Sequence, residues 1–238
     1  MPARMAVPKE IVSGERRVAL DPTMAERFAK LGAELLVEKG AGRSAFFPDE
    51  AYSKSSRLID DAKALYAEAD VVFKVQAPTL EEVELLKDGA TLLAVLLPHR
   101  NLDLVKRLRD KKITSFAMEL IPRISRAQSM DVLSSQAAVA GYKVALLAAN
   151  LASGFFPMLT TAAGTIRPSK VVIIGAGVAG LQAIATCRRL GAMVEAYDVR
   201  PAARQEIESL GAKMIDTGVN AASEGGYARE LTAEEKQK

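Results

Sequence analysis

The chain has 238 residues, of which 49% are hydrophobic and 26% charged, a composition typical of a globular protein with room for two modest domains. Its net charge of +3 is small and spread along the sequence, which gives no electrostatic support for nucleic-acid binding. No uninterrupted apolar run approaches the roughly 18 residues of a membrane span, and the N-terminus lacks the apolar core of a signal peptide. One cysteine, Cys187, and one histidine, His99, exclude an internal disulfide and a multi-histidine metal site, so we expect no metal.

The first half of the chain alternates short apolar runs with helical patterns, which predicts an α/β domain. The expected strands are residues 5–8, 34–38, 70–75, 91–96 and 113–118. The expected helices are residues 22–31, 48–58, 61–69, 80–87 and 102–109. Asp21 followed by Pro22 is typical of a helix N-cap with proline in the first turn, which supports the first of these helices.

A polar loop at residues 122–129 leads into a long helical pattern that ends near residue 150. The pattern is rich in alanine and other apolar residues, so we expect a helix that is buried on most sides and joins two domains. The polar side chains at its start are Arg123, Gln128, Asp131 and Ser134. A helix beginning near Gln128 would place Asp131 and Ser134 on one face. Such a set could hold a carboxamide and a ribose, or it could be a capped helix start with solvated arginines, and spacing alone leaves both open.

A glycine motif, Gly175-x-Gly177-x-x-Gly180, follows an apolar run and opens a helical pattern, as in a dinucleotide-binding turn. Gly175 permits a tight turn, Gly177 lets the backbone approach a pyrophosphate, and Gly180 lets the helix pack close to the strand. The pyrophosphate would lie at the helix N-terminus, where backbone amides and the helix dipole favour negative charge. The motif alone is weak evidence, since glycine pairs also end ordinary strands, but the strand before it and the helix after it favour a nucleotide site.

The next apolar strand ends in Asp198, at the distance expected for an acid that accepts hydrogen bonds from the adenosine ribose. A carboxylate there would repel a 2′-phosphate, which predicts NAD(H) rather than NADP(H) as the ligand. The alternative is a solvated carboxylate at a strand end. Arg200 complicates the prediction, because a nearby arginine can accommodate a 2′-phosphate; we expect it to flank the adenine or to face solvent.

After Asp198 the sequence predicts one further helix, one short strand, a surface loop and a solvated tail, at residues 202–210, 213–216, 217–226 and 231–238. We therefore predict an α/β protein of two Rossmann-like domains joined by a long helix, with the second domain incomplete at its C-terminus. The predicted divisions are an N-terminal α/β domain at 1–128, a linking helix and connector at 129–160, and the first half of an NAD(H)-binding domain at 161–238.

Three further residues are weaker candidates. Lys74 and Arg17 lie near predicted strand ends and could contact an anion, although such residues are more often surface charges. His99 follows a strand and could act as an acid or a base, but no residue near it in the sequence pairs with it. A single histidine and a helix-borne cysteine cannot compose a nucleophilic triad.

Four stretches of the sequence are distinctive: PKEIVSGERRVALDP, AMELIPRISRAQSMDVLSSQAAVAGYKV, TAAGTIRPSKVVIIGAGVAGLQAIATCRRLGA and GGYARE. They closely resemble the NAD(H)-binding part of the alpha subunit of proton-translocating NAD(P) transhydrogenases, within the alanine dehydrogenase/transhydrogenase family. The segment PRISRAQSMD is far more specific than the glycine motif, and the resemblance runs from residue 8 to about residue 230.

The resemblance implies roles for individual residues. Those implied to surround the nicotinamide are Arg123, Gln128, Asp131 and Ser134. Those implied to line the adenosine side are Val178, Asp198 and Arg200, and Gly226 and Tyr227 are implied to lie on a mobile loop that closes over the nucleotide.

The resemblance also implies a reaction and an assembly. Hydride would pass from NADH directly to NADP⁺ held by a separate subunit or domain, coupled to proton movement through a membrane-spanning subunit. The chain would position the dihydronicotinamide without supplying a proton donor. It would form a homodimer on the cytoplasmic face of the inner membrane, attached through its partner subunits, with no nucleic acid and no insertion of its own into the bilayer.

Two alternatives remain open. An alanine-type amino-acid dehydrogenase would need a histidine where this sequence has Leu97, and His99 lies two residues further on. Lys74 and Arg17 match substrate-binding residues of that enzyme and would remain as relics of the fold or minor contacts. A non-catalytic module is the second alternative, because the family's component continues past residue 238 with further strands. We expect those strands to lie on another chain or to be lost.

Overall fold

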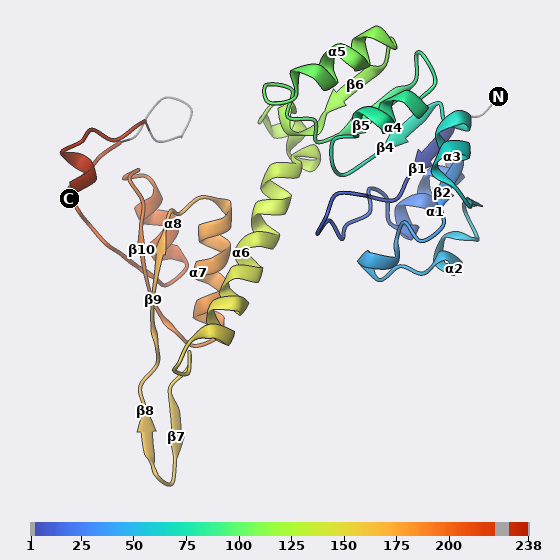
Figure 1. Cartoon of the computed structure of the whole chain (residues 1–238). Coiled ribbons are helices and arrows are strands. Elements are labelled where there is room, and N and C mark those ends of the chain that lie inside the picture. The colour runs from blue at the N-terminus through green and yellow to red at the C-terminus, as the bar shows by residue number, and fades with distance from the viewer. Residues whose placement is uncertain (1–2, 222–228, 238) are drawn as a thin grey trace. The chain divides into compact units, whose positions relative to one another are not determined.

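A computed structural model describes residues 3–221 and 229–237 of the chain (Figure 1). The backbone divides into two compact units, Met1–Asp131 and Val132–Lys238.

The first unit is built on a six-stranded, wholly parallel sheet with the strand order β3-β2-β1-β4-β5-β6. The strands are β1 (Arg4–Val7), β2 (Glu34–Glu38), β3 (Arg57–Ile59), β4 (Val71–Phe73), β5 (Thr91–Ala94) and β6 (Thr114–Ala117). The helices are α1 (Pro22–Lys30), α2 (Asp49–Tyr52), α3 (Ala62–Glu68), α4 (Leu80–Leu85) and α5 (Leu102–Asp110), with short 3-10 turns at Arg43–Ala45, Met118–Leu120 and Ser125–Met130. The predicted α/β domain is therefore confirmed.

The two faces of this sheet bury separate apolar clusters, as a parallel sheet covered on both sides requires. One cluster contains Leu36, Val72 and Leu92, and the other contains Val7 and Val37. The strand order reverses between β1 and β4, so the chain leaves these two neighbouring strands in opposite directions. In open parallel sheets such a point, at the carboxyl ends of the strands, is where ligands commonly bind.

Two elements of the first unit bear on the sequence prediction. The expected helix at residues 48–58 is wrong, because α2 ends at Tyr52 and the chain then enters β3. Tyr52 is fully buried and its hydroxyl donates to the Leu20 carbonyl at 2.9 Å, which anchors the short helix. The predicted cap of α1 is confirmed: the Asp21 carboxylate accepts from the Met24 amide at 2.8 Å.

The second unit contains a three-stranded parallel sheet of order β11-β10-β9. Its elements are α6 (Val132–Leu151), β7 (Leu159–Thr161), β8 (Gly164–Ile166), β9 (Lys170–Ile174), α7 (Val178–Arg189), β10 (Met193–Tyr197), α8 (Ala203–Ser209), β11 (Lys213–Met214) and a 3-10 turn at Glu235–Gln237. The run β9-α7-β10-α8-β11 confirms the predicted start of a nucleotide-binding fold. Ile184, Ala196 and Ile207 lie in its buried core.

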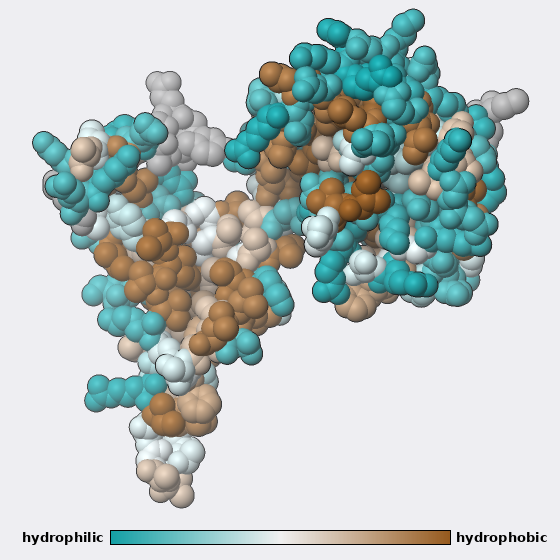
Figure 2. All heavy atoms as spheres, viewed as in Figure 1, coloured by the Kyte–Doolittle hydropathy of each residue, from teal (hydrophilic) through white to brown (hydrophobic). Residues whose placement is uncertain are grey.

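Helix α6 packs against α7 through a close backbone approach. A Cβ placed on Gly141 would overlap the carbonyl oxygen of Ala179, so only glycine fits at this crossing. The expectation that α6 is buried on most sides is wrong, because Gly141 and Ala145 are its buried residues and Val139 and Leu147 are exposed. Hydrophobic side chains accordingly cover much of the visible face of this unit (Figure 2).

Among the described residues, α6 is also the one helix long and apolar enough to cross a membrane by length and composition. The sequence did not suggest a span here, because Gln136 and Lys143 interrupt the apolar run. A single helix of this kind is weak evidence for a span, since the helices of folded domains can pass the same test. The close approach of α6 to α7 at Gly141 is typical of a helix packed within a folded domain.

The segment between α6 and β9 is a β-hairpin, which was not predicted from the sequence at the end of the connector. Strands β7 and β8 pair antiparallel, with Thr160 opposite Thr165 and Thr161 opposite Gly164. Gly164 has a φ of +129°, a conformation that favours glycine. Every residue of both strands is exposed in this unit.

Candidate functional site

The glycine motif forms the turn between β9 and α7. Gly175 has a φ of +93°, and its amide donates to the Tyr197 carbonyl at 2.7 Å, which ties the turn to the end of β10. A Cβ on Gly180 would overlap the Gly175 carbonyl oxygen, so the helix lies against the turn only because residue 180 is glycine. A Cβ on Gly177 would meet nothing within 4 Å, which leaves open space beside the backbone there.

The N-terminus of α7 presents backbone donors next to this open space. Gly177 is the N-cap residue in an extended conformation, and the first intrahelical bond runs from the Leu181 amide to the Gly177 carbonyl at 2.8 Å. The amides of Val178 and Ala179 precede that bond and have no intrahelical acceptor. Val178 is 46% exposed. Amides at the positive end of a helix dipole suit a phosphate.

Asp198 lies directly after β10 and reaches back to the turn. Its carboxylate is 7% exposed and accepts from the Ala176 amide at 2.7 Å and from the Arg200 amide at 2.8 Å. The Arg200 side chain donates to both carboxylate oxygens, through Nε at 2.9 Å and Nη2 at 3.0 Å. Burial alone would raise the pKa of Asp198, but the hydrogen bonds from Arg200 and Ala176 outweigh it and hold the pKa below its usual range.

The structure thus brings together Gly175, Gly177, Gly180 and Asp198, as the sequence motif requires. Arg200, expected to flank the adenine or to face solvent, instead pairs with Asp198. The structure does not leave Asp198 as a solvated strand end, because the carboxylate is buried against the turn. Gly226 and Tyr227, expected on a closing loop, lie outside the described residues.

The residues expected around a nicotinamide divide between the two units. In the first unit the Arg123 Nε lies 3.9 Å from the Asp131 carboxylate, and Gln128 is exposed on the 3-10 turn Ser125–Met130. Ser134 lies in the first turn of α6, in the second unit. The expected shared helix face of Asp131 and Ser134 is wrong, because Asp131 is extended, with a ψ of 91°, and α6 begins after it.

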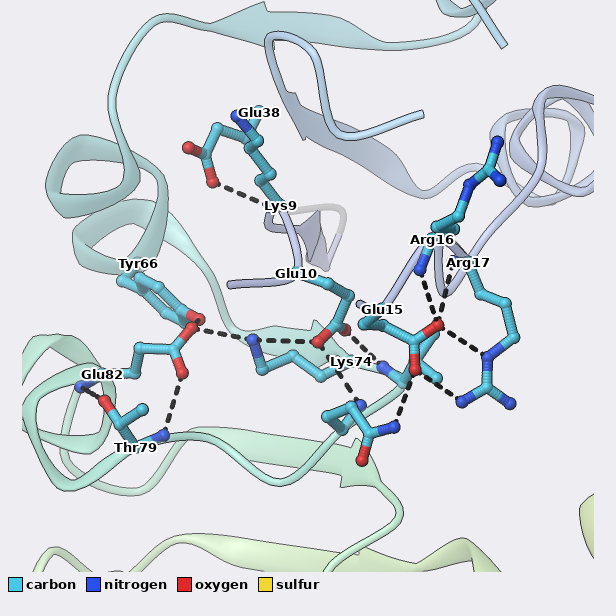
Figure 3. A network of polar contacts seen from close by, with 12 residues as sticks. Lys9, Glu10, Glu15, Arg16, Arg17, Glu38, Tyr66, Lys74, Thr79 and Glu82 are labelled. Atoms are coloured by element: carbon cyan, nitrogen blue, oxygen red, sulfur yellow. Dashed lines mark hydrogen bonds and ion pairs between the residues drawn. The ribbon is translucent and has the colours of Figure 1, made fainter. Parts of the chain in front are cut away.

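The first unit holds a buried ion network that the sequence pattern did not predict (Figure 3). Lys74 is not a surface charge: its side chain is 1% exposed and its Nζ lies 2.7 Å from Glu82 and 3.5 Å from Glu10. The Tyr66 hydroxyl donates to Glu82 at 2.9 Å, and burial, reinforced by that carboxylate, raises the pKa of Tyr66 well above its usual value. The Glu10 carboxylate also accepts from the Val75 amide at 2.6 Å.

A second ion pair lies beside this network. The Arg17 guanidinium donates to the Glu15 carboxylate at 2.8 and 2.6 Å, and Gln76 Nε2 donates to it at 2.7 Å. The hydrogen bond from Arg17 is the main reason that the pKa of Glu15 falls from 4.5 to about 2. Most residues of both groups follow β1 and β4, the two strands at which the sheet order reverses. The location of these residues just after two predicted strands was the one feature of the sequence that could have indicated the network. No spacing rule links residues this far apart in sequence.

Leu97 and His99 follow β5. Leu97 is 44% exposed with a φ of +46°, and its amide and that of Leu96 donate to the Glu119 carboxylate at 2.6 and 3.1 Å. That carboxylate holds a backbone conformation that a leucine rarely adopts. His99 lies in an open depression of about 620 Å³, which Arg100 and residues of α5 also line.

In the part of the chain that the structure describes, no group of three histidine, cysteine, aspartate or glutamate side chains could hold a metal ion. Cys187 is 2% exposed, and burial raises the pKa of its thiol, which disfavours the reactive thiolate.

Two family models cover nearly all of this architecture. Residues 6–140 match the alanine dehydrogenase/PNT N-terminal domain, and residues 144–237 match the alanine dehydrogenase/PNT C-terminal domain. The chain belongs to the alanine dehydrogenase/PNT family. The family resemblance expected from the sequence is therefore confirmed.

Within the family, the chain is more similar to transhydrogenases than to alanine dehydrogenases among the relatives compared. It is 46% identical to the first part of the NAD(P) transhydrogenase alpha subunit of Rhodospirillum rubrum, over 99% of this chain and 64% of that protein. A crystal structure of transhydrogenase from Sinorhizobium meliloti has a TM-score of 0.87 and 44% identity, over 90% of this chain and 64% of that one. Alanine dehydrogenase of Methanococcus maripaludis is more distant, at 33% identity over 82% of this chain and 53% of that enzyme.

The chain spans 45% to 64% of the length of the transhydrogenase relatives it matches. The more similar relatives are named as the NAD(P) transhydrogenase alpha subunit or as its first part.

Proposed function

We propose that this chain is the NAD(H)-binding component of a proton-translocating transhydrogenase. The observation that carries the proposal is the turn at Gly175–Gly180, where open space beside Gly177 adjoins the backbone amides at the start of α7. A pyrophosphate could rest on those amides, with Val178 beside the adenosine. The higher identity to transhydrogenase alpha subunits than to alanine dehydrogenases supports the choice within the family.

We propose that Asp198 selects NAD(H), with NADP(H) held by the partner subunit. The carboxylate is buried beside the turn and its lowered pKa keeps it ionised, so a 2′-phosphate would meet a fixed negative charge. A ribose diol, in contrast, offers two O–H donors to the same oxygens.

The chemistry assigned to the protein is positioning. The residues proposed to orient the nicotinamide are Arg123, Gln128, Asp131 and Ser134. The distance of 3.9 Å between Arg123 and Asp131 supports the view that these two residues act together as an ion pair. Direct hydride transfer between two nicotinamides needs no proton donor, in keeping with Leu97 where an alanine dehydrogenase would use a histidine.

The assembly is proposed on the same basis. The R. rubrum relative is named as one part of a subunit, which supports a complex in which NADP(H)-binding and membrane-spanning subunits complete the enzyme. We propose that this chain is a homodimer on the cytoplasmic face of the inner membrane, held there by those partners.

Titration calorimetry with NADH and NADPH tests the nucleotide site directly. We expect the wild-type chain to bind NADH and not NADPH. Gly177→Ala should abolish NADH binding without loss of stability, because its Cβ would meet only the ligand, whereas Gly180→Ala should destabilise the second unit as well. Equal NADH binding by wild type and Gly177→Ala would refute the site.

Hydride transfer tests the reaction. Mixed with the NADP(H)-binding subunit of a transhydrogenase, the chain should transfer hydride from NADH to NADP⁺ in rapid-mixing absorbance measurements. NADH oxidation that depends on pyruvate and ammonia, with no partner present, would instead identify an alanine-type dehydrogenase. No NADH binding at all would identify a non-catalytic module.

A further inference from the structure

The carboxylate of Asp198 has no acceptor position left for a ligand. Each carboxylate oxygen can accept about two hydrogen bonds. Oδ1 accepts from the Arg200 amide and Nε, at 2.8 and 2.9 Å. Oδ2 accepts from the Ala176 amide and from Arg200 Nη2, at 2.7 and 3.0 Å. All four positions are therefore filled by the chain itself.

These four donors are of two kinds. The amides of Ala176 and Arg200 belong to the backbone of the turn and of the strand end, and they stay in place when a side chain moves. The other two, Nε and Nη2, belong to the Arg200 side chain, which is 26% exposed and joined to the backbone by flexible bonds. Arg200 Nη2 also donates to the Ala176 carbonyl at 3.3 Å, so the guanidinium extends from Asp198 to the glycine turn.

A ribose diol brings two O–H donors, the number that the Arg200 side chain supplies to Asp198. We propose that the Arg200 guanidinium occupies the ribose position of the nucleotide site and that NAD(H) enters by displacing it. The inference rests on the proposed function, since it assumes that Asp198 receives the ribose. It assigns Arg200 a role different from the adenine contact that the sequence suggested.

This exchange also discriminates between ligands. A diol replaces both side-chain hydrogen bonds that Asp198 loses, whereas a 2′-phosphate removes one of those hydroxyl donors and adds negative charge. A 2′-deoxyribose likewise replaces only one, without the added charge. Arg200 is therefore a specificity-determining residue. A ligand binds well only when its hydroxyls replace the hydrogen bonds that Asp198 loses as the guanidinium leaves.

Calorimetry on the full chain with matched variants tests the inference. Arg200→Ala removes the competing donors and should bind NADH about tenfold more tightly, with a faster association rate. Arg200→Lys keeps the charge but cannot bond both carboxylate oxygens and the turn at once, so its affinity should fall between those of the wild type and Arg200→Ala. Arg204→Ala removes a surface arginine that pairs with Asp216, and should bind as the wild type does.

Ligands that differ by one ribose hydroxyl provide a second test of the displacement model. The gain in affinity on Arg200→Ala should be larger for 5′-AMP than for 2′-deoxy-5′-AMP, because the deoxy ligand brings one hydroxyl to Asp198 and displaces only one of the two Arg200 side-chain hydrogen bonds. In nitrogen-15 NMR of the wild type, the Arg200 Nε–H should be protected from exchange without ligand and should lose that protection when NADH saturates the site.

The outcomes separate the two proposals. Wild-type NADH binding together with unchanged or weaker binding by Arg200→Ala overturns the displacement model and leaves the proposed function standing. An Arg200 Nε–H that stays protected at NADH saturation overturns it equally. Failure of every variant to bind NADH overturns both proposals.

Discussion

Replacing Lys74 by methionine should strongly destabilise the first unit. The Lys74 side chain is 1% exposed, and it lies between Glu10 and Glu82, whose side chains are 3% and 10% exposed. Methionine fills a similar volume but leaves two buried carboxylates without a cation. Removing one partner from a buried ion network typically costs about 3–5 kcal/mol. The remaining donors to Glu82, including the Tyr66 hydroxyl, cannot offset the missing charge.

Hydrogen exchange followed by mass spectrometry suits this test, because it reports the two units separately. Urea dependence of exchange in β1 and β4 should give a free energy of unfolding lower by about 3–5 kcal/mol in Lys74→Met. The matched control is Lys106→Met, which removes an exposed lysine paired with Asp103 and should change stability by less than about 0.5 kcal/mol. A loss in Lys74→Met no larger than in the control would refute the reasoning, since it would mean that water reaches the network.

Three further predictions follow from single contacts. The folded pKa of Glu15, about 2 against a usual 4.5, means that its carboxylate stabilises the fold above the higher value and loses this contribution as the pH falls toward the lower one. Its partner Arg17 is 45% exposed, so solvent weakens the pair, and we expect the free energy of unfolding to fall by about 1–2 kcal/mol between about pH 6 and pH 2. Urea titrations measure this fall, which should be smaller in Glu15→Gln. Identical pH profiles for the two proteins would contradict the prediction. Gly141→Ala should lower the melting temperature of the second unit, because its Cβ would overlap the Ala179 carbonyl, while Val139→Ala on the exposed face serves as the control. Cys187 should react with a thiol reagent only as fast as the second unit opens, and rapid labelling of the folded chain would count against its burial.

Local sequence signals predicted most of the helices and strands. The strand at residues 34–38 coincides with β2, and the start of α1 follows from an Asp–Pro cap that the structure contains. Strand β3 was missed because three residues carry too little periodicity, and its pairing with β2 is a non-local contact. The hairpin of β7 and β8 was missed because its threonines, alanines and glycine resemble a linker, and every residue of both strands is exposed.

Part of the candidate site depends on local sequence and part on contacts between residues distant in sequence. The turn from Gly175 to Gly180 could be predicted, since the local backbone geometry requires the glycines there. The acid at position 198 was expected beside the turn because parallel strands end at one edge of the sheet. Its pairing with Arg200 depends on side-chain geometry that spacing does not determine. The Lys74 network joins residues that are distant in sequence, such as Glu10 and Val75, which lie 65 positions apart, and no periodic pattern predicts such contacts.

Both units place an ion pair at the carboxyl ends of parallel strands, where ligands of this fold class bind, and burial separates their roles. Lys74 is almost completely enclosed and faces two carboxylates, so breaking its contacts would leave charges in a medium that cannot solvate them. Arg200 is 26% exposed, and its guanidinium can exchange Asp198 for water at a much smaller cost. The Lys74 network therefore suits a permanent structural role in the sheet. The Asp198–Arg200 pair suits a contact that a ligand replaces. For this reason we assign ligand exchange to Arg200 and expect Lys74 substitutions to act mainly on stability.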